Sequence, residues 1–473
     1  MNSQSVPDPG ETTRRWFLSQ CGIGLGTAAL SELMPSQVSA SEGTQPQPSH
    51  YGGKAKAVIY LFMAGAPSQL ELFDNKPLLK ELEGKPLPKS VIGNQRYAFI
   101  QPDAAVLGPR MSFARHGQSG AEISSAMPHL AKIADDICLI RSMHTDQFNH
   151  APAQLFFNSG FSQPGRPSMG SWIIYGLGAE TRDLPAFVVM STGSGLSGGA
   201  ALWSSGFLPT VYTGVRFRSQ GDPVLNLANP PGVNAAIQDE TFGLLRDLNS
   251  QRMKLIHDPE IATRIAVFEM SARMQTSTPE LMDLSSETPE TLTMYDCDPD
   301  KPSFARACLL ARRMVERGVR FINIYHSGWD AHTDVEGNVR KHSKATDQGA
   351  AALVTDLRQR GMLDETLVIW GGEFGRTPMV ESNPSLGRSL GRDHHPQAFT
   401  MWLAGGGIRP GMTLGKTDDF GFHVVESPIH VHDLQATVLH CLGLDHERLT
   451  YHLAGRDFRL TDVHGHVVEE ILA

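Results

Sequence analysis

The sequence has little cysteine, no excess of basic residues and, beyond its first 40 residues, no long apolar run. Its five cysteines include no C-x-x-C pair, which excludes a disulfide-rich scaffold. Lysine and arginine number 41 against 50 acidic residues, without a basic stripe, so neither nucleic acid nor an anionic membrane is an expected partner. No later apolar run reaches the roughly 20 residues of a membrane span, so no integral membrane segment is expected once the N-terminal segment is removed.

What is abundant points to a large domain with metal chemistry. A chain of 473 residues with 40% hydrophobic residues suits one large α/β domain with insertions, or two domains. Histidine occurs 19 times, mostly at predicted loop positions. Because imidazole is a common metal ligand, this distribution favours a metal site.

The first 40 residues are typical of an export signal. Arg14 and Arg15 precede an apolar run from Cys21 to Leu33, and Val38-Ser39-Ala40 offers small residues for cleavage. This order is that of a secretory signal, and the paired arginines resemble the motif read by the twin-arginine translocation machinery. We therefore expect residues 1–40 to be a signal peptide and the protein to be periplasmic or extracellular.

Replacing Arg14 and Arg15 with lysine is expected to leave the protein in the cytoplasm, because the twin-arginine receptor reads that pair. Fractionation of the native host, followed by immunoblotting, compares the variant with the wild type. Normal appearance of the variant outside the cytoplasm would contradict this expectation.

The rest of the chain alternates apolar strands with helices, which is typical of a parallel α/β sheet with crossover helices. Expected strands are 55–63, 136–143, 186–191, 319–325, 366–370 and 399–404, and expected helices are 303–317, 341–360 and 432–442. After a polar linker over 41–53, residues 54–473 are expected to form one domain. Residues 192–300 or thereabouts interrupt the alternation and are predicted to be an insertion, as a lid or cap.

Residues able to bind metals concentrate where the predicted strands end. In open parallel sheets, ligands bind beyond the carboxyl ends of the strands, where imidazoles and carboxylates can surround one or two divalent ions. Mixed nitrogen and oxygen ligands suit Zn, Mn or Fe, and carboxylate-rich sets suit Mg or Ca. The candidate ligands are Glu71, His144, Asp146, Asp330, His332, Glu373, His394 and His395.

Four segments, in this order, resemble the exported bacterial family called domain of unknown function 1501. They are Ala64–Ser68, Gly328–His332, Glu373–Thr377 and Asp393–His395. That family is considered related to the alkaline phosphatase and sulfatase superfamily. The resemblance implies an alkaline-phosphatase-like α/β/α sandwich with a mostly parallel central sheet and an inserted cap region.

The same resemblance suggests roles for single residues. Asp330 and His332 resemble the aspartate and histidine that bind one metal, and His150 lies where sulfatases place their nucleophile. His150 is not the cysteine or serine that becomes formylglycine, Phe374 replaces a histidine ligand, and Ala64-Gly65 lacks the usual aspartate. Formylglycine chemistry is therefore not expected. His144, Asp146, His150 or Glu71 would have to complete the ligand set.

Several residues keep two interpretations. Glu373 is a ligand or the partner of Arg376, and Arg376 pairs with an anionic ester or braces Glu373. One of His394 and His395 is expected to bind metal and the other to be structural. The supporting candidates are Asp393 and His326, as partners of metal ligands, and Asn149, as a group that polarises a substrate oxygen.

These features favour an exported metal-dependent hydrolase of phosphate or sulfate esters, from small molecules or polysaccharides. Attack by metal-activated water is preferred over attack by His150. The alternative is a non-catalytic binding or assembly protein that retains the fold. Asp330, His332, Glu373 and one of the paired histidines should approach a single point, with His144 and His150 bordering the same cleft.

Overall fold

The computed structural model describes residues 45–93, 97, 99–101, 103–193, 195–218, 223–224, 227, 232–256 and 259–473. The predicted signal peptide and the start of the predicted linker lie outside this part. From Gln47 on, the linker lies against the body of the protein, because the Gln47 amide donates to the Leu177 carbonyl and the His50 amide to the Gly443 carbonyl, both at 2.9 Å. None of the described helices combines the length and the apolar character needed to cross a membrane.

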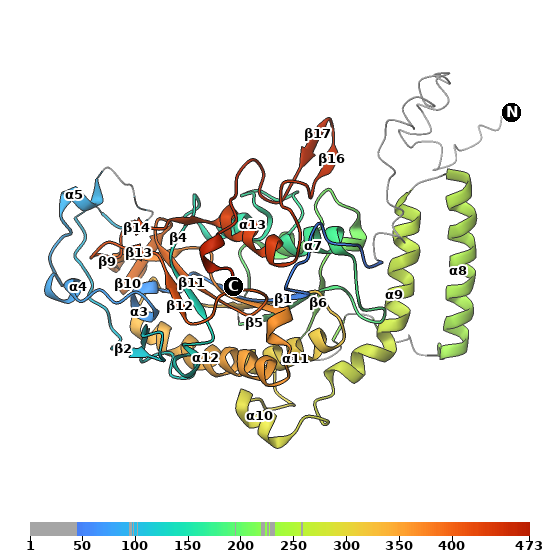
Figure 1. The fold of residues 1–473 in the computed structure, drawn as a ribbon, viewed down its shortest axis with the longest axis horizontal. Helices are drawn as coiled ribbons and strands as arrows, with labels where there is room; N and C mark the ends of the chain where they lie inside the picture. The colour runs from blue at the N-terminus through green and yellow to red at the C-terminus, as the bar shows by residue number, and fades with distance from the viewer. Residues whose placement is uncertain are drawn as a thin grey trace.

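A nine-stranded, mostly parallel sheet forms the centre of the protein (Figure 1). The strands follow the order β12-β4-β11-β8-β1-β7-β5-β6, and β15 also pairs with β4. Only β11 is antiparallel to its neighbours, β4 and β8. The strands are β1 (Ala57–Ala64), β4 (Cys138–His144), β5 (Phe187–Thr192), β6 (Val215–Phe217), β7 (Phe321–Ser327), β8 (Thr366–Gly371), β11 (Phe399–Ala404), β12 (Met412–Leu414) and β15 (Ile429–His430). The predicted fold class is confirmed, and the six expected strands lie within two residues of their predicted ends.

Helices cover both faces of the sheet because its central strands are apolar on both sides. In β1, every residue is buried, and successive side chains enter two different hydrophobic cores. Leu61 lies in one core and Phe62 in the other. Continuous apolar strands of this kind are typical of parallel sheets covered on both faces. The first core includes α11 (Phe304–Glu316) and α12 (Val335–Gln359), and the second includes α6 (His150–Ser159), α7 (Met169–Leu177) and α13 (Val431–Cys441).

The three expected helices correspond to α11, α12 and α13. The Ser303 side chain accepts from the Arg306 amide at 3.0 Å and so caps α11 at the predicted residue. α12 begins at Val335, six residues earlier than expected, because Asp334 caps it by accepting from the Gly337 amide at 3.0 Å.

Within the predicted insertion, the helices lie beside the sheet. α8 (Ala235–Ile256) and α9 (Pro259–Met282) stand side by side beyond β6, and α10 (Pro289–Tyr295) follows (Figure 1). A separate ribbon of β9 (Gly375–Asn383) and β10 (Arg388–His395) lies at the opposite end of the molecule (Figure 1). The candidate site is built on this ribbon, so α8 and α9 do not cover it.

Candidate functional site

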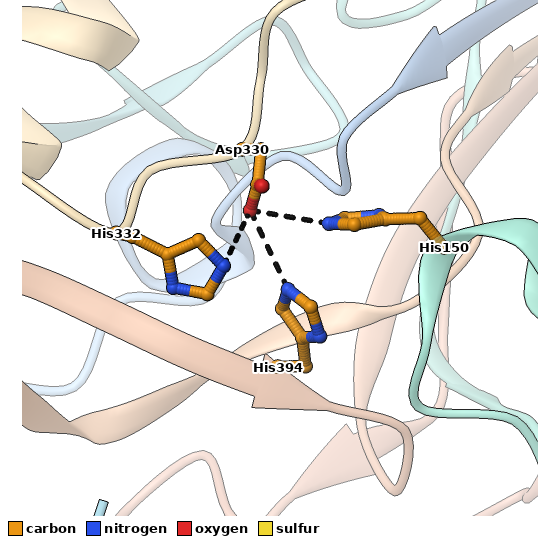
Figure 2. Close-up of side chains that lie close together, drawn as sticks. All are labelled: His150, Asp330, His332 and His394. Atoms are coloured by element: carbon orange, nitrogen blue, oxygen red, sulfur yellow. Dashed lines mark hydrogen bonds and ion pairs between the residues drawn. The ribbon is translucent and has the colours of Figure 1, made fainter. Parts of the chain in front are cut away.

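Four side chains from three segments meet at the carboxyl end of β7 (Figure 2). Asp330 and His332 follow β7, His150 is the first residue of α6, and His394 lies in β10. The Nε2 atoms of His150, His332 and His394 lie 3.2, 3.0 and 3.4 Å from Asp330 Oδ1. Because one ligand atom from each residue lies within 4.8 Å of all the others, this cluster could hold a metal ion.

Two glycines allow these segments to approach each other. Gly65, directly after β1, has a φ of +106°, and a Cβ there would lie 2.5 Å from the Asp330 amide nitrogen. A Cβ on Gly391 of β10 would lie 2.1 Å from the carbonyl carbon of His332. Glycine is therefore needed at both positions. The Ala64-Gly65 sequence, which lacks an aspartate, instead makes room for the Asp330 loop.

Each histidine of the cluster is held through its other ring nitrogen. His150 Nδ1 lies 2.7 Å from Glu373 Oε1, and His332 Nδ1 contacts Glu381. His394 Nδ1 lies 2.7 Å from the Phe148 carbonyl oxygen. Metal-binding histidines usually donate this second N–H to a carboxylate or a backbone carbonyl, which fixes the ring and its tautomer. All three rings show this pattern.

The hydrogen-bond partners leave a position for a cation. Carbonyl and ionised carboxylate oxygens only accept hydrogen bonds, so we assign the proton of each ring to Nδ1. Burial lowers the pKa of His394 to about 4, so this ring is neutral. Its Nε2 then faces Asp330 Oδ1 as one acceptor facing another, at 3.4 Å. A cation between these atoms would remove this unfavourable contact.

The other two rings hold protons more strongly. Burial opposes the protonation of His150, but its contacts with Asp330 and Glu373 outweigh burial and raise its pKa to about 9. Burial opposes the protonation of His332 as well, but its contacts with Asp330 and Glu381 outweigh burial and raise its pKa. Burial acts against ionisation of Asp330 too, yet its contacts with His150 and His332, together with the nearby Arg376, hold its pKa well below the ordinary value. The cluster therefore attracts protons, and by the same charges it would attract a metal ion.

Arg376 is buried beside the cluster, and each of its three guanidinium nitrogens donates to a protein group. Its Nη2 lies 2.6 Å from Asp330 Oδ1 and also donates to the Gly65 carbonyl. Its Nε and Nη1 donate to the carbonyls of Ala66 and Arg392, at 3.0 and 3.1 Å. Its partner is thus Asp330 rather than Glu373.

Negative charge is in excess around the cluster once its histidines have lost their extra protons. When all carboxyl groups are ionised and the histidines are neutral, four carboxylates face two guanidinium groups, which leaves two negative charges uncompensated. The carboxylates are Asp330, Glu373, Glu381 and Asp393, and the guanidinium groups are Arg376 and Arg388. Burial raises the pKa of Asp393, so part of this excess can be relieved by a proton instead. A divalent ion would balance the charge completely.

Glu373 stands one step behind the cluster. It is buried, and its Oε1 accepts from the Gly65 amide and from Gln154 Nε2, both at 3.0 Å, in addition to its contact with His150. Asp393 has a comparable place, since its oxygens accept from the Phe99 and His394 amides at 2.8 and 2.7 Å. His332, Glu381 and Asp393 also form a second group with ligand atoms within 4.8 Å of one another.

Other candidates from the sequence lie outside the cluster. His395 Nε2 contacts the Phe422 carbonyl at 2.6 Å, because neighbouring side chains of β10 point to opposite faces. Glu71 forms a buried ion pair with Arg392 at 2.9 Å. The His144 ring lies 5.2 Å from that of His430, and Asp146 pairs with His430 at 3.3 Å. His326 contacts Thr192 and His342. Asn149 is exposed directly before α6.

Sequence reasoning missed Glu381, which holds the His332 ring. A strand predicted over Gly375–Asn383 would have pointed to this residue, but no strand is predicted there from the sequence. The register of β9 against β10 pairs His394 with Arg376 and Gly391 with Glu381. The ribbon thus brings Glu381 and His394 to the same site.

A family model described as protein of unknown function (DUF1501) matches residues 55–472. No curated protein matches the sequence. Among solved structures, a protein in the alkaline phosphatase superfamily from Vibrio parahaemolyticus is similar, with 10% identity, a TM-score of 0.35, and coverage of 87% of this chain and 72% of that one. The PsFucS1 sulfatase from Pseudoalteromonas sp. gives 12% identity, a TM-score of 0.34, and coverage of 93% and 73%. A Mg-bound variant of TAB5 alkaline phosphatase gives 11% identity, a TM-score of 0.33, and coverage of 83% and 99%.

Proposed function

Because the chain belongs to the DUF1501 family of proteins of unknown function, we propose its activity from the site itself: a metal-dependent hydrolase of phosphate or sulfate esters. The observation that carries this proposal is the convergence of three imidazole Nε2 atoms on Asp330, each ring being anchored through Nδ1. His150, His332, His394 and Asp330 would hold the ion. Three nitrogen ligands and one oxygen ligand favour Zn or Mn over Ca or Mg.

The ion would supply Lewis-acid polarisation of an ester oxygen and lower the pKa of water near it. Access is available because the Asp330 side chain is 40% exposed. Arg376 would position Asp330 rather than bind substrate, since it is buried and each of its guanidinium nitrogens already donates to a protein group. Asn149 is exposed next to His150, where it could contact a substrate oxygen.

Arg388 is the guanidinium group that we assign to the anionic part of the substrate. Its Cζ lies 4.6 Å above the Phe99 ring, and that ring lies 5.1 Å from the His332 ring. The Arg388 side chain is partly exposed, although it is paired with Glu381. An anionic ester of a small molecule or a polysaccharide would find this charge beside the ion. Export by the twin-arginine route, to the periplasm or beyond, belongs to the same proposal.

The test is metal analysis of protein purified from the native host, together with hydrolysis of p-nitrophenyl phosphate and p-nitrophenyl sulfate. We expect one or two Zn or Mn ions per chain and hydrolysis of at least one ester that stops on chelation and returns with the metal. Protein without bound metal would contradict the proposal. Glu447→Gln, an exposed substitution far from the cluster in the sequence, serves as the matched control and should keep full activity.

A second candidate is a non-catalytic metal-binding protein, since four protein ligands can complete a tetrahedral site. The Co(II)-substituted protein separates the two functions. If phosphate changes the visible absorption spectrum, a coordination position is open, as hydrolysis requires. A spectrum that phosphate leaves unchanged, in protein that hydrolyses neither ester, would favour the binding function.

Metal affinity is expected to rise with pH up to about pH 9, because a proton on His150, whose pKa is about 9, must leave before the metal binds. While one proton is displaced, the apparent affinity should increase roughly tenfold per pH unit. Zn titrations between pH 6 and 8 measure this slope. An affinity that is independent of pH would show that His150 is not a ligand.

A further inference from the structure

Among the helices that the structure describes, α8 is the outermost. Figure 1 shows it beyond α9, which lies between α8 and the sheet. α9 is joined to the body, since Arg273 Nε and Ser277 Oγ donate to the carbonyls of Arg182 and Asp183, both at 2.6 Å. α8 is joined to α9 by an ion pair between Arg246 Nε and Glu269 Oε1 at 3.1 Å. One face of α8 therefore contacts α9, and the other faces outward.

The outward face carries a regular apolar stripe. Ile237, Leu244, Leu248 and Leu255 are 47%, 62%, 53% and 82% exposed. With the exposed Thr241 and Gln251 between them, the stripe residues are spaced alternately four and three apart, which is the spacing of a coiled-coil seam. Among the described residues, nothing covers this stripe. Soluble proteins rarely expose several large apolar side chains in a row along one helix face, so the stripe indicates an interaction surface.

We propose that this stripe pairs with the same stripe of a second copy of the chain, with the two α8 helices antiparallel. The stripe is symmetric about position 246: Ile237 and Leu255 are each nine residues from it, Thr241 and Gln251 five, and Leu244 and Leu248 two. A two-fold axis at this level sets Ile237 against Leu255, Thr241 against Gln251, and Leu244 against Leu248 of the other copy. The surface is thus complementary to itself, as a two-fold interface requires.

The charges of α8 favour the antiparallel direction. Asp239 and Glu240 lie near its N-terminus and Arg252 near its C-terminus, and all three are exposed. Antiparallel pairing brings the acidic end of one helix to the basic end of the other, and it also aligns the helix dipoles favourably. Thr241 and Gln251 can form a hydrogen bond across the seam, and a polar layer of this kind selects one register.

Cysteine cross-linking tests the direction and the register. In one helix, positions 237 and 255 are about 27 Å apart at 1.5 Å rise per residue, too far for a bond within one chain. The double variant Ile237→Cys/Leu255→Cys should form a reducible covalent dimer on mild oxidation, whereas each single variant should not. The four described cysteines are buried and free, and the wild type reports any background. Single variants that cross-link as well as the double variant would overturn the antiparallel pairing.

Sedimentation velocity tests the dimer itself. We expect the wild type to sediment as a dimer, with twice the mass of one chain, and the Leu244→Glu/Leu248→Glu double variant to sediment as a monomer. Circular dichroism should show an unchanged fold, because these side chains already lie in solvent. Leu453→Glu, at another exposed leucine on β16 (Tyr451–Leu453), should remain dimeric. A monomeric wild type would overturn the proposal, even if it binds phosphatidylglycerol vesicles through this stripe instead. A Leu244→Glu/Leu248→Glu variant that remains a dimer would overturn it as well.

Discussion

His394→Gln is expected to lower the affinity for Zn by more than about 100-fold, since loss of an outer hydrogen-bond partner alone typically costs 10–100-fold. His394 contributes one of the three Nε2 atoms that converge on Asp330, and its ring is held by the Phe148 carbonyl. The amide of glutamine is a much weaker Zn ligand than imidazole, so the substitution would leave an incomplete site. Competition titrations with a chromophoric chelator measure the change, and hydrolysis of p-nitrophenyl esters should fall with metal content.

The neighbouring histidine provides the matched control. His395 carries the same side chain one position later, but its Nε2 contacts the Phe422 carbonyl. His395→Gln keeps a donor for that carbonyl and should retain the metal. If both variants lose metal to the same extent, the loss reflects damage to β10, and the role of His394 as a ligand is not supported. If His394→Gln binds Zn like the wild type, the proposed site is incorrect.

Arg392→Met is expected to destabilise the protein by about 3–5 kcal/mol, the typical cost of removing one partner from a buried ion pair. Arg392 and Glu71 are fully buried, with Nη2 2.9 Å from Oε1. The arginine also donates to the carbonyls of Thr377 and Leu107, at 3.0 and 2.9 Å. The substitution leaves a buried carboxylate and two carbonyls without this donor. The shift in the midpoint of urea unfolding measures the effect.

Arg358→Met is the control for this prediction. Arg358 pairs with Asp136 at the surface, where its side chain is 52% exposed. An exposed pair contributes only about 0–1 kcal/mol, so this variant should unfold close to the wild type. Equal destabilisation by the two variants would show that burial of the Arg392–Glu71 pair has no special weight. The same experiment bears on Glu71, which the structure places in this pair rather than among the four clustered side chains.

The strands of the central sheet could be read from the sequence because the signal is local. A strand buried on both faces must be apolar at every position, so β1 appears as an unbroken apolar run that ends directly before Gly65. Helix α11 could also be predicted from the sequence, since its Ser303 cap and its helical spacing of apolar residues lie within one short segment. α12 was predicted too short because its first two turns are rich in polar residues, and only the Asp334 cap marks its start.

Only part of the candidate site could be predicted from the sequence. Asp330 and His332 stand out because they follow β7 within a few residues, at the end of the sheet where ligands bind. The choice between His394 and His395 required knowledge that the segment is a strand, since only then must adjacent side chains point to opposite faces. Glu373 was predicted to be a possible metal ligand, and Glu381 was not predicted at all. A carboxylate that orients a histidine has no sequence pattern that distinguishes it from one that binds a metal.

The sequence by itself determined which segments are buried, in which order strands and helices alternate, and that imidazole and carboxylate groups gather at strand ends. These properties depend on hydrophobicity and spacing over a few residues. Only the tertiary structure decided which of these groups share a site. His150, Asp330 and His394 are 64 to 244 residues apart in the chain, yet they converge on one oxygen atom. That convergence depends on the close approach permitted at Gly65 and Gly391 and on the β9–β10 ribbon, because contacts between distant segments are set by packing rather than by local sequence.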